Sequence, residues 1–173
     1  RMIYNALFAA QSPDGRKLRY YTALQGPREY FSRDTYCCPN NFRWIMSKLP
    51  SFIYYRYRNG ILVNLFERSE AEINCDDEFT VRIVQETNYP ANGVVKIKVF
   101  PSSKKRFPLY IRRPGWCKEI DLTLNGKKHN IAYENDIIIV DRNFEEGDEI
   151  VIDFHMEWRC VKGFRKQFGR VAV

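Results

Sequence analysis

Two adjacent cysteines, Cys37 and Cys38, are the residues of this sequence with the clearest chemical potential. Pro39 follows them and suits a first helical turn, where its missing N–H has no partner to lose. The positive end of a helix dipole lowers the pKa of a thiol and favours the thiolate, which is both a nucleophile and a soft metal ligand. Local sequence leaves two interpretations open: a reactive or metal-binding pair, or two buried and inert cysteines.

The rest of the chain offers few partners for a metal bound by this cysteine pair. A metal site needs about four ligands, and the two histidines, His129 and His155, are better explained as surface or strand residues. Neither a CxxC pair nor a His-rich motif occurs, so no self-contained zinc finger is predicted. The remaining ligands would come from outside this sequence or from acidic loop residues such as Glu29 or Asp34.

Other motifs of enzyme chemistry are weak. The acidic runs 76–78 and 145–149 are typical of a solvated turn and a charged loop, not of the paired carboxylates of ordinary glycosidases. A Gly-rich phosphate loop and a nucleophilic serine elbow are both absent from the sequence. The aromatic cluster 54–57 could stack on a sugar, but we interpret it as the cover of a junction between helix and sheet.

The composition is that of a globular protein with a basic surface. Of 173 residues, 45% are hydrophobic and 28% charged, and no apolar run approaches the roughly 20 residues of a membrane span. The net charge is +7, but the cations are scattered, which favours a solvated surface over a nucleic-acid interface. The five cysteines fit no disulfide framework, so a mostly reduced chain is predicted. No signal peptide is visible, and the compartment is left undefined.

The hydrophobic pattern changes character near Asn59-Gly60. Before this point it predicts a helix tail over 1–10, a strand over 18–24 and a kinked helix over about 40–56. After it, short alternating segments are separated by turn signals, which is typical of an antiparallel β-sandwich. The predicted fold class is therefore mainly β: a sandwich over 59–173, preceded by a short helical segment over 1–58. The chain starts on Arg1, not Met, and ends in an apolar strand, so we expect further protein beyond it.

Several motifs, taken together and in order, resemble glycoside hydrolase family 127, the β-L-arabinofuranosidase family. They include Tyr4-Asn5-Ala6-Leu7, Tyr20-Tyr21-Thr22-Ala23-Leu24, Cys37-Cys38-Pro39-Asn40, Glu86-Thr87-Asn88-Tyr89-Pro90 and Arg112-Arg113-Pro114-Gly115-Trp116-Cys117. The resemblance implies an (α/α)6 barrel followed by β-sandwich domains. Residues 1–58 would be the end of the barrel, and 59–173 a sandwich that is truncated at its C-terminus.

The resemblance also implies an unusual mechanism. In this family, zinc is held by three cysteines and one glutamate, and one of two adjacent cysteines is the nucleophile of a retaining reaction. Carried over, Cys37 resembles the nucleophile and a zinc ligand, and Cys38 resembles a second zinc ligand. Tyr20 resembles a tyrosine that faces the sugar, and Cys117 is expected to be a buried sandwich residue.

Two parts of the family pattern are missing from this sequence. The family's Glu-x-Cys ligand pair and its acid/base glutamate should lie upstream, and no Glu-x-Cys occurs here. We therefore expect half a zinc site, no turnover by the isolated chain, and an L-arabinofuranoside-type glycan as the substrate of the complete protein, with no nucleic-acid or membrane partner. The alternative is a non-catalytic carbohydrate-binding or structural β-sandwich module, which would give the cysteine pair no role.

Overall fold

The computed structural model describes residues 3–19, 27, 29–30 and 37–172, and they fall into two compact units, Arg1–Ser51 and Phe52–Val173. The sequence placed the boundary seven residues later, between 58 and 59. The assignment of the first unit to a helical barrel stays a prediction. Within the described residues, no helix has the length and apolar character that crossing a membrane requires.

The first unit contains short helical segments and one longer helix. A π-helical turn, Ile3–Leu7, and a 3-10 turn, Phe8–Ala10, precede a tight turn. The predicted turn at Ser12-Pro13-Asp14-Gly15 is confirmed: Gly15 N–H donates to the Ser12 carbonyl at 2.8 Å, and Gly15 adopts a positive φ of 73°. Beyond this turn, Leu18 pairs with Gln11 in an isolated antiparallel bridge. Residues 20–24 of the predicted strand lie outside the described residues.

Helix α1 spans Cys37–Lys48 and continues as a 3-10 turn, Leu49–Phe52. The prediction of a helix as far as residue 56 is wrong, because Tyr54–Tyr57 forms strand β1. Pro50 disrupts the α-helical hydrogen-bond pattern. The side-chain amide of Asn64 then donates to the carbonyl of Phe52, and its backbone N–H donates to the carbonyl of Ile53, each at 2.9 Å or less. Aromatic residues fit the pleated surface of a strand well, and β1 pairs with β2.

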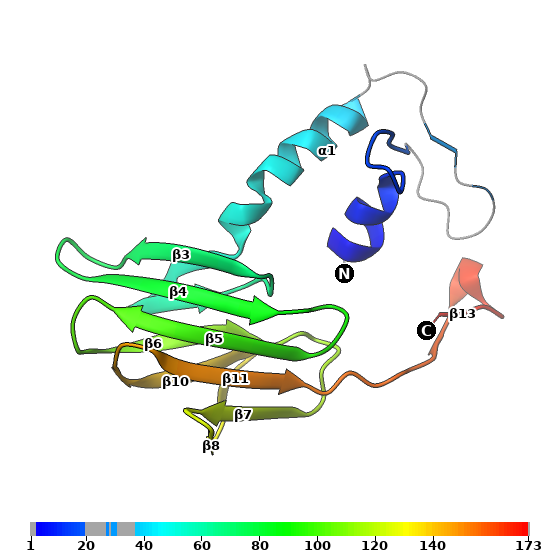
Figure 1. Ribbon diagram of the computed structural model, residues 1–173. Helices are drawn as coiled ribbons and strands as arrows, with labels where there is room; N and C mark the ends of the chain where they lie inside the picture. Colours follow the sequence, from blue (N-terminus) through cyan, green and yellow to red (C-terminus); the bar gives the residue numbers. More distant parts are fainter. Residues whose placement is uncertain (1–2, 20–26, 28, 31–36, 173) are drawn as a thin grey trace. The chain divides into compact units, whose positions relative to one another are not determined.

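The second unit is the predicted sandwich (Figure 1). Its strands are β2 (Gly60–Val63), β3 (Ser69–Asn74), β4 (Thr80–Thr87), β5 (Val94–Pro101), β6 (Lys105–Arg112), β7 (Ile120–Leu124), β8 (Lys127–Lys128), β9 (Ala132–Glu134), β10 (Ile137–Phe144) and β11 (Asp148–Phe154). One sheet has the order β1-β2-β6-β10-β9 and the other β3-β4-β5-β11-β7-β8. A separate two-stranded ribbon pairs β12 (Val161–Lys162) with β13 (Val171–Ala172).

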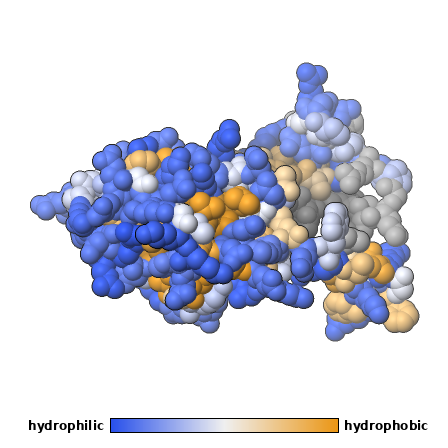
Figure 2. Space-filling model, turned by 60° about the horizontal axis from the view of Figure 1, so that its bottom comes forward, coloured by the Kyte–Doolittle hydropathy of each residue, from blue (hydrophilic) through white to orange (hydrophobic). Residues whose placement is uncertain are grey.

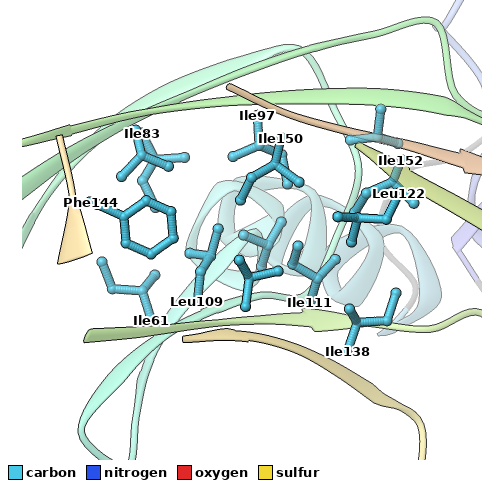
Figure 3. Close-up of a cluster of buried hydrophobic side chains, with 14 of the residues drawn as sticks. Ile61, Ile83, Ile97, Leu109, Ile111, Leu122, Ile138, Phe144, Ile150 and Ile152 are labelled. Atoms are coloured by element: carbon cyan, nitrogen blue, oxygen red, sulfur yellow. The ribbon is translucent and has the colours of Figure 1, made fainter. Parts of the chain in front are cut away.

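Alternation along the strands builds the core between the two sheets. Val95, Ile97 and Val99 of β5 are fully buried, while the intervening residues of the strand are more exposed. Figure 3 shows Ile97 and Ile150 of one sheet facing Leu109 and Ile111 of the other. This is the one-sided burial that an alternating pattern predicts, and the mainly antiparallel sandwich is confirmed. On the face shown in Figure 2, hydrophilic residues cover most of the sandwich surface, with smaller apolar patches between them.

One pairing in the sandwich is parallel: β2 lies beside β6, with Ile61 opposite Leu109 and Val63 opposite Ile111. Gly60 makes this approach possible, because a Cβ there would lie 2.0 Å from the carbonyl oxygen of Pro108. The hairpin that joins β1 to β2 therefore lies at the start of β6. This position brings two charged segments together, the hairpin with Arg56 and Arg58 and the start of β6 with Lys105 and Arg106.

Candidate active site

The cysteine pair lies where the sequence predicted it, at the first residues of a helix. α1 begins at Cys37, whose side chain is exposed, while Cys38 is partly buried. Their sulfur atoms lie 3.9 Å apart. Neither cysteine forms a disulfide, nor do the other three, and the reduced state of the chain stays a prediction.

The separation of the two sulfurs is compatible with a shared zinc ion. Zn–S bonds of about 2.3 Å at a tetrahedral angle place two sulfur ligands about 3.8 Å apart, close to the 3.9 Å between Cys37 Sγ and Cys38 Sγ. A disulfide would need about 2.05 Å. Thiolates also belong to the donor types that zinc prefers. The pair therefore fits zinc as two of its ligands.

The described part of the chain does not complete such a site. No group of three or more His, Cys, Asp or Glu side chains that could hold a metal occurs among the described residues. Glu29 is described and exposed and belongs to no such group. Asp34, the other acidic candidate, and Tyr20, the predicted sugar-facing residue, lie outside the described residues. Their roles stay predictions.

A hollow of about 510 Å³ adjoins the cysteine pair within the first unit. Cys38, Asn41 and Arg19 line it, and its other walls are apolar residues such as Leu7 and Phe42. Arg19 was missed by the sequence analysis. It is 4% exposed, its Nη2 donates to the carbonyl of Ala9, and its Nε and Nη1 have no hydrogen-bond partner among the described residues. The only available signal was a cation beside Leu18, the residue that pairs with Gln11.

Cys117 is a buried residue of the sandwich, as expected. It is 1% exposed, and its thiol donates to the carbonyl of Glu119 at 3.0 Å. Burial raises the pKa of this thiol, as it does for the partly buried Cys75. Both groups are therefore held in the neutral form, which is neither a nucleophile nor a metal ligand. Cys37 and Cys38 are the better candidates for thiolate chemistry.

The histidines lie in the sandwich unit, and His155 has a structural partner there. Its Nε2 lies 2.8 Å from Asp121 Oδ2, and this hydrogen bond raises the pKa of His155 and lowers that of Asp121. The stabilisation is present below the unfolded-state pKa of about 6.5 and is lost as pH rises through the higher folded-state pKa. The predicted surface role for this histidine agrees with an exposed ion pair.

We expect an NMR titration of the His155 ring to have its midpoint above about 6.5. In an Asp121→Asn variant, the midpoint should fall toward that value, because the amide cannot stabilise the imidazolium as a carboxylate does. Both side chains are exposed, so the fold should survive the substitution. An unchanged midpoint in Asp121→Asn would show that another group sets the pKa of His155.

Comparison with known proteins identifies a family model and solved structures that are similar to this chain. Residues 60–156 match the family model described as β-L-arabinofuranosidase, GH127 middle domain. A GH127 β-L-arabinofuranosidase from Geobacillus stearothermophilus is 28% identical, with a TM-score of 0.85 over 94% of this chain and 28% of that one. A second GH127 β-arabinofuranosidase is 26% identical, with a TM-score of 0.85 over 98% of this chain and 30% of that one.

A third solved structure, described as a glycoside hydrolase, is 26% identical and has a TM-score of 0.84 over 94% of this chain and 29% of that one. The comparison with curated proteins finds no match. The chain thus spans less than a third of the length of the solved proteins it resembles. The matched family model covers more than half of the sequence, and the chain belongs to the GH127 β-L-arabinofuranosidase family.

Proposed function

We propose that this chain is part of a zinc-dependent retaining glycoside hydrolase that acts on L-arabinofuranoside-type glycans. The observation that carries the proposal is the pair of adjacent cysteines at the start of α1, with sulfur atoms 3.9 Å apart, in a chain of the GH127 family. Two relatives of similar fold are described as arabinofuranosidases. A module with no catalytic role would give this pair of cysteines no function.

In this proposal, Cys37 and Cys38 would hold a zinc ion, which would keep a bound thiol deprotonated at neutral pH. Cys37 is the nucleophile. Its sulfur attacks the anomeric carbon, forming a C–S bond as the glycosidic C–O bond breaks, and the leaving oxygen takes a proton from an acid outside this chain. Water then attacks the same carbon, the conjugate base of that acid takes its proton, and the C–S bond breaks to release the thiolate, so that two inversions give net retention.

The remaining zinc ligands and the acid/base group are expected outside this sequence. We infer that the isolated chain has no turnover, because it holds two thiol ligands and, among its described residues, no third one. Tyr20 is proposed to contact the sugar. Tyr20 directly follows Arg19 in the sequence, and Arg19 lines the same hollow as Cys38.

Zinc content tests the proposal directly. In a longer protein that includes the upstream region, we expect about one zinc per chain after extensive desalting, and its loss in a Cys37→Ser/Cys38→Ser double variant. The isolated 173-residue chain should retain little, since two ligands bind far more weakly than four. The matched control is Cys75→Ser/Cys160→Ser, which removes two free thiols elsewhere and should keep the metal. Zinc that survives loss of Cys37 and Cys38 would refute the assignment.

A further inference from the structure

The sandwich has a cleft of about 340 Å³. Three segments form it: the β1–β2 hairpin, the loop between β3 and β4, and the first residues of β6. The loop after β3 and the start of β6 lie together at the left end of the sandwich in Figure 1. All three segments belong to the second unit.

The walls of this cleft are strongly cationic. Arg56, Arg58, Lys105 and Arg106 line it, and Asp76 is the one acidic residue among its lining. We refer to it as the basic cleft. Three of the four cations have ion-pair partners: Arg58 with Glu134, Lys105 with Asp76 at 2.6 Å, and Arg106 with Asp141. In the described part of the chain, the guanidinium of Arg56 has no hydrogen-bond or ion-pair partner.

The paired cations keep capacity for a further anion. Glu134 and Asp141 lie on β9 and β10 and are not part of the cleft lining. Arg106 uses Nε and Nη2 for Asp141, and its Nη1 has no partner in the part of the chain that the structure describes. Lys105 donates one N–H to Asp76, and an ammonium has three. Because these ion pairs are exposed, each contributes little to stability, and its cation can also bind an incoming anion.

The floor of the basic cleft is apolar. Phe79 and Phe107 both line it, and their rings pack edge to face with centroids 5.5 Å apart. The ammonium of Lys105 lies 4.7 Å from the centroid of the Phe79 ring. Aromatic walls displace water from one side of a bound group, and a charge-assisted hydrogen bond is stronger where water is excluded. A site with convergent donors on an apolar floor is typical of ligand pockets.

We propose that the basic cleft binds an oxyanion group, either a phosphate or the carboxylate of an acidic sugar. Arg56 supplies a guanidinium with no hydrogen-bond or ion-pair partner among the described residues, and the cationic side chains of Arg106 and Lys105 line the same cleft. Its volume of about 340 Å³ suits a group of monosaccharide size. A nucleic acid would need a longer run of cations than the three short segments provide. The proposal does not depend on the zinc or nucleophile assignments.

The test is an amide chemical-shift titration of the 173-residue chain at low ionic strength with three probes: inorganic phosphate, galacturonate and neutral galactose. We expect saturable shifts of cleft residues with at least one anion and none with galactose. Arg56→Gln should weaken the anion's binding about tenfold, since it removes charge-assisted hydrogen bonds. The matched control is Arg68→Gln, which removes one positive charge from an exposed residue that does not line the cleft.

The two anions distinguish the sources of the ligand. Saturation by phosphate with no response to galacturonate supports a phosphate site, and the reverse supports a site for an acidic glycan. Saturation by both supports the shared oxyanion chemistry. If Arg56→Gln and Arg68→Gln weakened the binding of the anion equally, the effect would come from net charge alone, which would overturn the proposal. Absence of saturable shifts with either anion would overturn it as well.

Discussion

Replacing Cys37 by Ser in the longer enzyme is expected to lower turnover by a factor on the order of 10⁴–10⁶, the range seen when a catalytic nucleophile is removed. A thiol is far more acidic than a serine hydroxyl, which stays protonated at neutral pH. The side chain is exposed at the first residue of α1. The substitution should therefore leave the fold intact, and a kcat measurement on an aryl arabinofuranoside checks the effect.

Controls separate the nucleophile from the metal ligand. Cys160→Ser makes the same chemical change at another exposed, free cysteine and should leave kcat unchanged. Cys38→Ser removes one proposed ligand but keeps the nucleophile, so we expect it to lose zinc. Cys37→Ser protein that unfolds at the same temperature as the parent but keeps full activity would contradict the nucleophile assignment. Loss of activity together with loss of the folded state would be resolved by Cys37→Ala, which changes no buried group.

The sandwich could be predicted from the sequence because each strand buries one face. Val94–Phe100 alternates apolar and charged residues, and Val95, Ile97 and Val99 are all fully buried. The end of α1 could not be predicted in the same way. Apolar residues at helical spacing ran past Pro50, but residues 54–57 form a strand through pairing with β2. A local hydrophobic pattern does not show that these residues pair with a strand that follows later in the sequence.

The candidate site was predicted in part, for a related physical reason. The cysteine pair is local, so a helix start at Pro39 was enough to place both thiols, and α1 does begin at Cys37. Arg19 and the basic cleft are non-local. The cleft joins Arg56, Asp76 and Lys105 from three segments, and in the sequence these charges look scattered. The parallel pairing of β2 with β6 brings two of the segments together. The hydrophobic periodicity of the sequence does not predict which strands pair.

Replacing Phe66 by Ala should destabilise the sandwich by about 3–5 kcal/mol, the usual cost of removing a buried aromatic ring. Phe66 is 1% exposed and lies in the connection between β2 and β3. Its ring centroid lies 4.9 Å from that of Phe154, at the end of β11, and 5.5 Å from that of Tyr89. The guanidinium of Arg112 on β6 lies 5.8 Å from the same ring.

These contacts explain why the loss should be large. Arg112 belongs to one sheet and Phe154 to the other, so Phe66 fills space where the two sheets meet. Alanine would leave a cavity that neither sheet can close without moving its hydrogen-bonded partners. Urea unfolding measures the effect as a shift of the midpoint at constant slope. Phe168→Ala is the matched control, because this ring is 86% exposed and its removal should change stability by at most about 0.5 kcal/mol. Equal losses in the two variants would show that Phe66 does not join the sheets.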